Sequence, residues 1–156
     1  MPVELALYQP EIAQNTGTLL RLGACLGVPV HIIHPTGFPF SRRSLKRGGL
    51  DYLDAAQMVE HDSYAQFLNW LRGAGRRLIL LTTKAKQSAY AAPYAETDIL
   101  LLGRESIGVP AEVAAGADVR VRIPMRDGLR SINVAMAGAL IWGEALRQTG
   151  HFETLT

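Results

Sequence analysis

The chain has 156 residues, 48% of them hydrophobic and 19% charged, so it can bury a core and is neither disordered nor of low complexity. Its net charge of +2 is mildly basic, and its single cysteine, Cys25, excludes a disulfide framework and favours a reducing, cytoplasmic setting. The sequence shows no signal peptide and no apolar run near the roughly 20 residues that span a membrane. We therefore expect one domain over residues 1–156, no membrane association, and a frayed tail at 150–156.

The first half of the chain alternates short apolar runs with helical patterns of apolar residues. In chain order the patterns predict a strand at 3–8, a helix at 15–26, a strand at 28–34, a basic helix at 41–47, a weak strand at 57–60 and a helix at 64–73. We expect Gly27 to end the first helix and Ser63 to cap the third.

The second half continues the alternation and ends in a long helix. The patterns predict, in order, a central strand at 78–83, an irregular polar segment at 84–96, a buried strand at 98–103, a short helix at 110–115, an alternating strand at 119–123 and a helix from near Ser131 to about Gln148. Apolar strands that alternate with helices indicate an α/β fold with a mostly parallel sheet.

Three of these strands lead into polar loops that contain ligand-binding residue types. The loops cover residues 81–84, 102–108 and 123–133, and in a parallel sheet they meet at the carboxyl edge, where ligands bind. The last loop runs into a helix N-terminus, whose unpaired backbone N–H groups can contact a ligand. The polar residues at 15–21 can join the loops after folding, so we expect a binding site at this edge.

Hydrolase and metal chemistry find less support. Ser106 lies one residue away from the position that a Gly-x-Ser-x-Gly nucleophile elbow needs, which disfavours an α/β hydrolase. The histidines lack the spacing of metal ligands, so we expect no metal site. We expect a structural or exposed position for each of them, namely His31, His34, His61 and His151.

Several motifs resemble the trefoil-knotted SPOUT RNA methyltransferases. The most similar group is the small, single-domain family that methylates the ribose 2′-hydroxyl of the tRNA wobble nucleotide, a cytidine or uridine at position 34. The matching segments are residues 10–21 (PEIAQNTGTLLR), 47–52 (RGGLDY), 102–110 (LGRESIGVP), 123–125 (IPM), 131–134 (SINV) and 144–148 (EALRQ). Each motif alone is weak, but their common order and spacing make the resemblance specific.

The resemblance implies a fold and a reaction. The fold would be a parallel sheet with a C-terminal trefoil knot, in a homodimer whose active sites lie near the subunit interface. The apolar residues of the first and last helices could form that interface or belong to the ordinary core. The reaction would be S-adenosylmethionine-dependent methylation of the wobble ribose, without a metal. Methylation of another tRNA or rRNA ribose, and a catalytically silent RNA-binding dimer, remain alternatives.

The resemblance also assigns residues to the cofactor. It implies that main-chain groups hold S-adenosylmethionine around Leu81, Gly103, Ile123 and Met125, together with Ser131 and Asn133. Glycine at position 103 permits close backbone approach, and the Ile123 and Met125 side chains offer apolar surface to adenine. Alternatively, Gly103 simply forms a turn, and Ser131 and Asn133 form the cap and first turn of the last helix.

The catalytic candidates are Arg21, Asn15 and Glu105. The resemblance implies that Arg21 either takes the proton of the ribose hydroxyl as a base or acts as a positioning cation. A guanidinium with a pKa above about 12 is a poor base, so binding a substrate phosphate or the developing alkoxide is easier to justify. Glu105 is expected to orient Arg21, and the alternative for Arg21 is a structural ion pair with Glu11 or Glu105. The alternative for Asn15 is a helix N-cap.

Basic clusters are the candidates for contact with the tRNA anticodon stem-loop. The residues expected to bind RNA are Arg42, Arg43, Lys46 and Arg47, although such a cluster can also be a solvated surface. Tyr52 or Phe38 can stack on a base or pack internally. Two positions depart from the wobble enzymes: Gly143 replaces a frequent tyrosine and Ala135 a frequent serine. Both changes can alter dimer packing.

Overall fold

The structure, a computed structural model, describes residues 1–49 and 52–156, with the side chains of 47–49 outside this description. Within it, seven parallel strands form one sheet in the order β3-β2-β1-β6-β4-β7-β5. The strands are β1 (Glu4–Tyr8), β2 (Val30–Ile33), β3 (Met58–His61), β4 (Arg77–Leu81), β5 (Gln87–Ser88), β6 (Asp98–Leu102) and β7 (Val119–Arg122). The predicted α/β fold with a parallel sheet is confirmed, and the knot stays a prediction.

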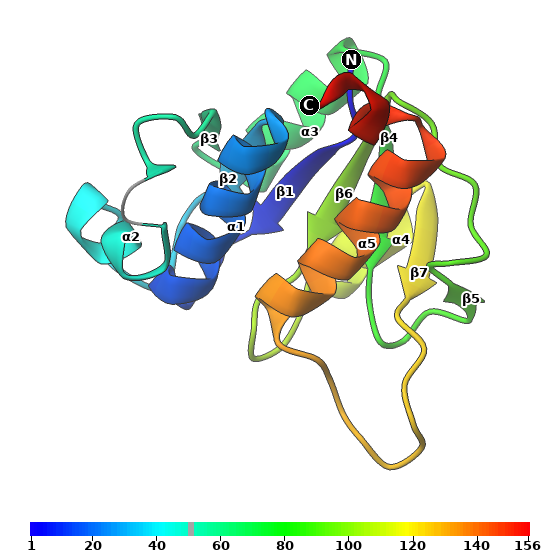
Figure 1. The fold of residues 1–156 in the computed structure, drawn as a ribbon. Coiled ribbons are helices and arrows are strands. Elements are labelled where there is room, and N and C mark those ends of the chain that lie inside the picture. The colour runs from blue at the N-terminus through cyan, green and yellow to red at the C-terminus, as the bar shows by residue number, and fades with distance from the viewer. Residues whose placement is uncertain (50–51) are drawn as a thin grey trace.

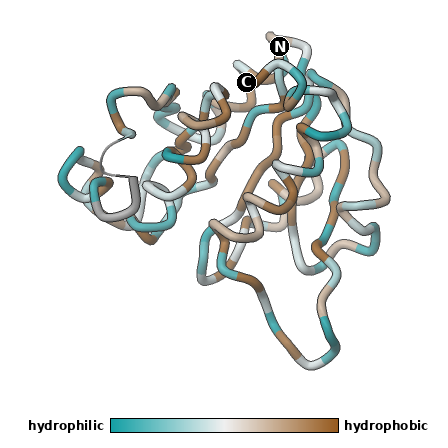
Figure 2. Tube along the Cα trace, in the orientation of Figure 1, coloured by the Kyte–Doolittle hydropathy of each residue, from teal (hydrophilic) through white to brown (hydrophobic). Residues whose placement is uncertain are grey.

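Helices cover both faces of the sheet (Figure 1). They are α1 (Ala13–Leu26), α2 (Arg42–Gly49), α3 (Tyr64–Gly73), α4 (Ala111–Gly116) and α5 (Val134–Gln148), followed by the 3-10 helix η2 (His151–Thr154). One core cluster joins α1 and α5 to the sheet, and a second cluster on the other face contains residues of α3 and α4. The central strands β1 and β6 are buried at every position and mostly hydrophobic, as expected of strands that helices cover on both faces. Figure 2 shows the middle of the sheet largely in brown.

Local signals set several boundaries as expected. Gly27 ends α1 in the left-handed region, with φ of 68°, and the Ser63 hydroxyl accepts a hydrogen bond from the backbone N–H of Gln66 at the start of α3. Helix α5 begins at Val134, later than predicted, because Asn133 caps it. Strand β5 was not predicted, since a two-residue strand carries no periodicity.

The C-terminal tail corrects another expectation. Residues beyond Gly150 were predicted to fray, but η2 forms there, and His151 Nε2 lies 2.7 Å from the Leu26 carbonyl oxygen. This contact ties the tail to the end of α1. The prediction failed because the anchoring partner lies far away in the sequence.

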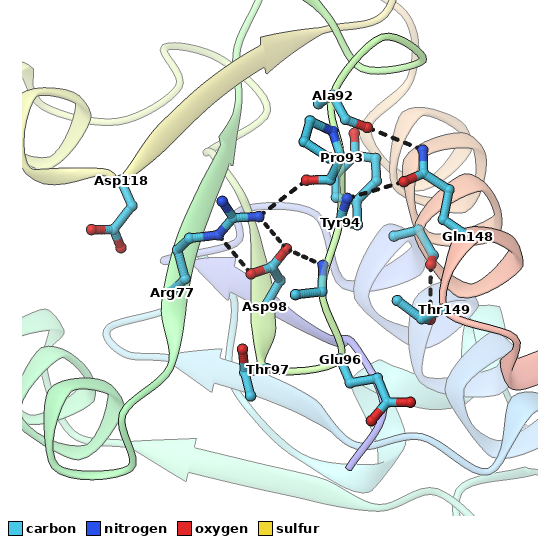
Figure 3. A network of polar contacts seen from close by, with 12 residues as sticks. Arg77, Ala92, Pro93, Tyr94, Glu96, Thr97, Asp98, Asp118, Gln148 and Thr149 are labelled. Carbon is cyan, nitrogen blue, oxygen red and sulfur yellow. Dashed lines mark hydrogen bonds and ion pairs between the residues drawn. The ribbon is translucent and has the colours of Figure 1, made fainter.

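A polar network fixes the segment between β5 and β6 (Figure 3). Arg77 donates two hydrogen bonds of 2.8 Å to the fully buried Asp98 carboxylate, which also accepts the Ala95 N–H. On the other side, the Gln148 amide accepts the Tyr94 N–H and donates to the Ala92 carbonyl. The network therefore joins the segment both to the sheet and to the end of α5.

A buried polar chain crosses β1, β2 and β3. His31 Nδ1 lies 2.9 Å from His61 Nε2, and His31 Nε2 lies 2.6 Å from a Glu4 oxygen, whose other oxygen accepts from Arg76 at 3.0 Å. Burial, and then the charge of His31, lower the pKa of His61. Burial works to raise the pKa of Glu4, but the hydrogen bonds and charges of His31 and Arg76 outweigh it and lower this pKa.

We expect the free energy of unfolding to fall as the pH drops below about 6.5. Both pKa values are depressed in the folded state, so the unfolded chain binds more protons and acid favours unfolding. The stabilisation that comes from the lowered pKa of His61 is present above the pKa that His61 has in the unfolded chain. It is lost as the pH falls through the pKa that His61 has in the folded protein. The stabilisation that comes from Glu4 is lost in the same way at lower pH. Urea unfolding at several pH values measures this slope. A His61→Gln variant should flatten it between pH 6.5 and pH 5, and an unchanged slope would contradict the assignment.

Candidate active site

An open cavity of about 970 Å³ lies at the carboxyl ends of β4 and β6, a size suited to a small-molecule ligand. The three predicted loops all contribute to its wall. The structure thereby brings together the residues predicted to hold the cofactor, since the lining includes Leu81, Gly103, Ile123, Met125, Ser131 and Asn133. Their role toward a cofactor stays a prediction. Asn15 and Glu105 also line the cavity, whereas Arg21 does not.

The loop between β6 and α4 folds tightly against itself. The backbones of Arg104 and Gly108 pair with N···O distances of 3.0 and 2.9 Å, and the Arg104 Nε also donates to the Gly108 carbonyl at 2.9 Å. Gly108 has φ of +68°, and a Cβ placed on Gly103 would lie only 2.7 Å from the Gly108 Cα. Glycine is therefore required at position 103 because the backbone of the same loop occupies the space.

Glu105 joins this loop to the start of α1. Its carboxylate accepts hydrogen bonds from the Glu11 N–H at 2.8 Å, the Ile12 N–H at 2.9 Å and the Asn15 amide at 3.3 Å. The α1 N-cap position, Ile12, has no side-chain cap of its own. Glu105 therefore caps the helix from a distant segment, and its negative charge lies where the helix dipole favours it. The alternative of Asn15 as the N-cap was wrong.

Glu11, just before α1, binds back to the loop that carries Glu105. Its carboxylate accepts from the Ser106 N–H at 2.9 Å and from the Ser106 hydroxyl at 2.7 Å. These two hydrogen bonds lower the pKa of Glu11. The sequence analysis did not foresee this role for Glu11, and no local signal could show it because the two residues are 95 positions apart. Ser106 is thus a loop anchor, with no histidine among its recorded hydrogen-bond partners in residues 1–49 and 52–156.

Hydrogen bonds continue from Asn15 to the start of α5. Asn133 donates from its amide to the Asn15 amide oxygen at 3.2 Å. The Asn133 oxygen accepts the N–H groups of Ala135 and Met136 at 2.8 and 3.2 Å, which makes it the α5 N-cap. Glu105, Asn15 and Asn133 therefore link three of the motif segments, residues 10–21, 102–110 and 131–134, at one wall of the cavity.

Arg21 lies on a different face of α1. It follows Asn15 by six residues, which places it roughly 240° around the helix, and its side chain is exposed. Its guanidinium carbon lies 4.5 Å from the centre of the Tyr52 ring. Glu105 bonds to Glu11, Ile12 and Asn15, so within a single chain it does not orient Arg21, and a contact between the two across a dimer stays a prediction. In the described part of the chain, Arg21 forms no ion pair with Glu11 or Glu105 either.

The predicted RNA-binding residues lie on α2. Arg42, Arg43 and Lys46 are exposed, and Arg42 forms an exposed ion pair of 2.7 Å with Asp54. The Arg47 side chain, Leu50 and Asp51 fall outside the described residues. Phe38 is half-buried and packs against the core, which favours internal packing for this ring.

The helices α1 and α5 bear both core and exposed residues. Leu19, Leu20, Ile141 and Trp142 are buried in the core, whereas other apolar positions on these helices are exposed. Met136 is 66% exposed and Leu140 is 44% exposed. A Cβ placed on Gly143 would have no neighbouring atom within 4 Å, and Ala135 is buried at the start of α5.

Residues 1–49 and 52–156 contain neither a candidate metal site nor a candidate membrane-spanning helix. No cluster of three or more His, Cys, Asp or Glu side chains could hold a metal ion there. Over the same residues, no helix combines the length and hydrophobicity that crossing a membrane demands.

Comparison with known proteins decides the family. Residues 2–142 match the SpoU rRNA Methylase family. The chain belongs to this family. It is 53% identical, over 97% of its length and 96% of the relative's, to a tRNA (cytidine(34)-2′-O)-methyltransferase of Ancylobacter novellus.

Solved structures agree with this assignment. A structure described in work on 2-OH methylation of C/U34 on tRNA is 44% identical, with a TM-score of 0.88 over 94% of this chain and 95% of the other. An AdoMet-bound rRNA methyltransferase of Sinorhizobium meliloti is 25% identical, with a TM-score of 0.82 over 94% of this chain and 56% of the other. The resemblance read from the motifs is thus confirmed at the level of fold and family.

Proposed function

We propose that this chain transfers a methyl group from S-adenosylmethionine to the ribose 2′-hydroxyl of the wobble nucleotide, cytidine or uridine 34, of tRNA. The observation that carries the proposal is the match, over nearly the whole of both chains, to a methyltransferase named for cytidine 34. The cavity adds support, because every residue that the motifs assigned to the cofactor lines it. A tRNA substrate also agrees with the cytoplasmic setting that the single cysteine favours.

The cavity wall fits S-adenosylmethionine. The tight loop at Gly103 and Gly108 forms part of the cavity wall, and Ile123 and Met125 supply apolar surface. The bound cofactor would supply an activated methyl group on its sulfonium. The chain's own task is then alignment of that group with the ribose, a contribution of roughly 7–11 kcal/mol in favourable model reactions. Glu105, Asn15 and Asn133 hold the participating segments together, so we infer that they are positioning residues.

We infer a homodimer in which α1 and α5 form the interface. These helices lie on the same side of the sheet (Figure 1), and α5 carries Met136 and Leu140, both exposed apolar side chains. Ile12, the N-cap residue of α1, is exposed as well. Exposed apolar residues on neighbouring elements favour association with another protein surface. Arg21 does not line its own chain's cavity, so in the proposed dimer it completes the site of the partner.

We infer that the exposed cations of α2 contact the anticodon stem-loop. Arg42, Arg43 and Lys46 present a basic surface next to α1, the helix that carries Arg21. Contacts of this kind attract phosphates without reading sequence, so they position the RNA and do not select its base.

The test is methyl transfer from labelled S-adenosylmethionine to tRNA that lacks 2′-O-methylation, with mapping of the modified nucleotide. We expect label on the wobble ribose with the wild type, and a loss of about a hundredfold or more with Arg21→Ala, because alignment at the reacting centre is lost. Label on another ribose would keep the family and replace the substrate. Absence of both label and cofactor binding by calorimetry would leave a silent RNA-binding protein.

A further inference from the structure

The contact between Arg21 and Tyr52 joins two segments of the chain that no hydrogen bond connects in the described structure. Arg21 extends from the exposed face of α1, and Tyr52 follows α2, which packs against α1. The guanidinium carbon lies 4.5 Å from the ring centre, well inside the limit of about 6 Å for a cation–π interaction.

Tyr52 is a well-anchored platform. Its carbonyl oxygen accepts hydrogen bonds from the N–H groups of Ala55 at 3.1 Å and Ala56 at 2.9 Å, which fixes a tight turn. Leu53 and Ala56 of the same turn pack against the core. The ring is half-buried and therefore has a restricted range of positions.

The kind of partner matters for what Arg21 can bind. Five other arginines of the described chain are paired with carboxylates, which neutralise them; these are Arg42, Arg72, Arg76, Arg77 and Arg147. Arg104, like Arg21, lies over a tyrosine ring, that of Tyr8. An aromatic ring instead occupies one face of a guanidinium and leaves its charge and its in-plane N–H groups available. Stacking thus restricts the side chain without competing for an anionic ligand.

We propose that Tyr52 is a positioning residue for Arg21, holding the guanidinium ready for the substrate phosphate or the developing alkoxide. This inference rests on the methyltransferase function proposed above. The role requires the aromatic face and not the hydroxyl, so tyrosine and phenylalanine are equivalent at this position and an aliphatic side chain of similar bulk is not.

The test is single-turnover methyl transfer with four variants: Tyr52→Leu, Tyr52→Phe, Arg21→Ala and the double variant Tyr52→Leu/Arg21→Ala. Tyr52→Leu keeps bulk and lowers the methyl-transfer rate about two- to fivefold, the factor expected of an exposed cation–π contact, and Tyr52→Phe retains the wild-type rate. In the Arg21→Ala background, Tyr52→Leu has no further effect. The affinity for S-adenosylmethionine, measured by calorimetry, is unchanged in all variants because neither residue is among those assigned to the cofactor and neither lines the cavity of its own chain.

Two results would overturn the inference. One is an equal loss from Tyr52→Leu with and without Arg21, which would show that Tyr52 acts through packing or direct RNA contact. The other is a wild-type rate for Tyr52→Leu. Both differ from failure of the proposed function, in which the wild type itself would not methylate the wobble ribose.

Discussion

Gly103→Ala is expected to weaken S-adenosylmethionine binding about a hundredfold and to reduce methyl transfer with it. A Cβ at this position would lie 2.7 Å from the Gly108 Cα and 2.8 Å from its carbonyl carbon, which are backbone atoms that no rotamer change can move. The loop must therefore shift by a few tenths of an ångström or more. Because this loop lines the cavity, the shift reaches the binding surface directly. Calorimetric titration with the cofactor measures the effect.

Gly116→Ala is the matched control for the same glycine-to-alanine change. Gly116 lies at the end of α4, has no neighbouring atom within 4 Å of a built Cβ, and does not line the cavity. Alanine there should leave cofactor affinity unchanged and alter stability by at most about 1 kcal/mol. Strong cofactor binding by a folded Gly103→Ala protein would show that the loop is not part of the binding surface.

The parallel character of the sheet was predictable because its central strands are buried along their whole length. Strands β1 and β6 are buried at every position, so each appears in the sequence as a short apolar run, and the intervening helices indicate parallel pairing. Ser63 and Gly27 act within a few residues of themselves, so their capping roles could also be predicted. Buried strands and helix caps of this kind depend on residues that are close together in the sequence.

Several failures share one physical cause, which is an interaction with a residue far away in the sequence. The rules for N-caps made Asn15 a reasonable cap for the first helix, but Glu105 performs that role from 93 residues away. The same rules placed Ser131 and Asn133 at the start of the last helix. Asn133 is its N-cap, and the Asn133 amide also donates a hydrogen bond to the distant Asn15. The tail is ordered for a similar reason, since His151 contacts the end of α1.

The motifs located the candidate site better than they assigned its interactions. Residues at the carboxyl edge of the sheet gather in one cavity, as the parallel topology requires. The resemblance also named Arg21, Asn15 and Glu105 as one group, yet only Asn15 and Glu105 contact each other. A family motif indicates which residues belong to the same active site, but it does not indicate whether those residues come from one chain or from two. Arg21 therefore needs a test that separates these cases.

Co-expression of Arg21→Ala chains with Gly103→Ala chains is expected to restore methyl transfer that neither variant shows alone. Helix geometry turns Arg21 roughly 240° away from Asn15, and Arg21 does not line the cavity of its own chain. If the proposed dimer places Arg21 at the partner's site, a mixed dimer has one complete site. That site combines the intact cavity of the Arg21→Ala chain with the intact Arg21 of the Gly103→Ala chain.

The expected recovery follows from symmetry. Random pairing makes about half of the dimers mixed, and each has one active site out of two, so about a quarter of the wild-type methyl transfer should return. Two differently tagged chains allow the mixed dimer to be purified, in which case about half of the wild-type rate is expected. If Arg21 serves its own chain's cavity, every site in the mixed dimer is defective, because one lacks the arginine and the other lacks cofactor binding. No recovery in a purified mixed dimer would therefore assign Arg21 to its own chain, and the exposed position of its side chain would then require a rearrangement on tRNA binding.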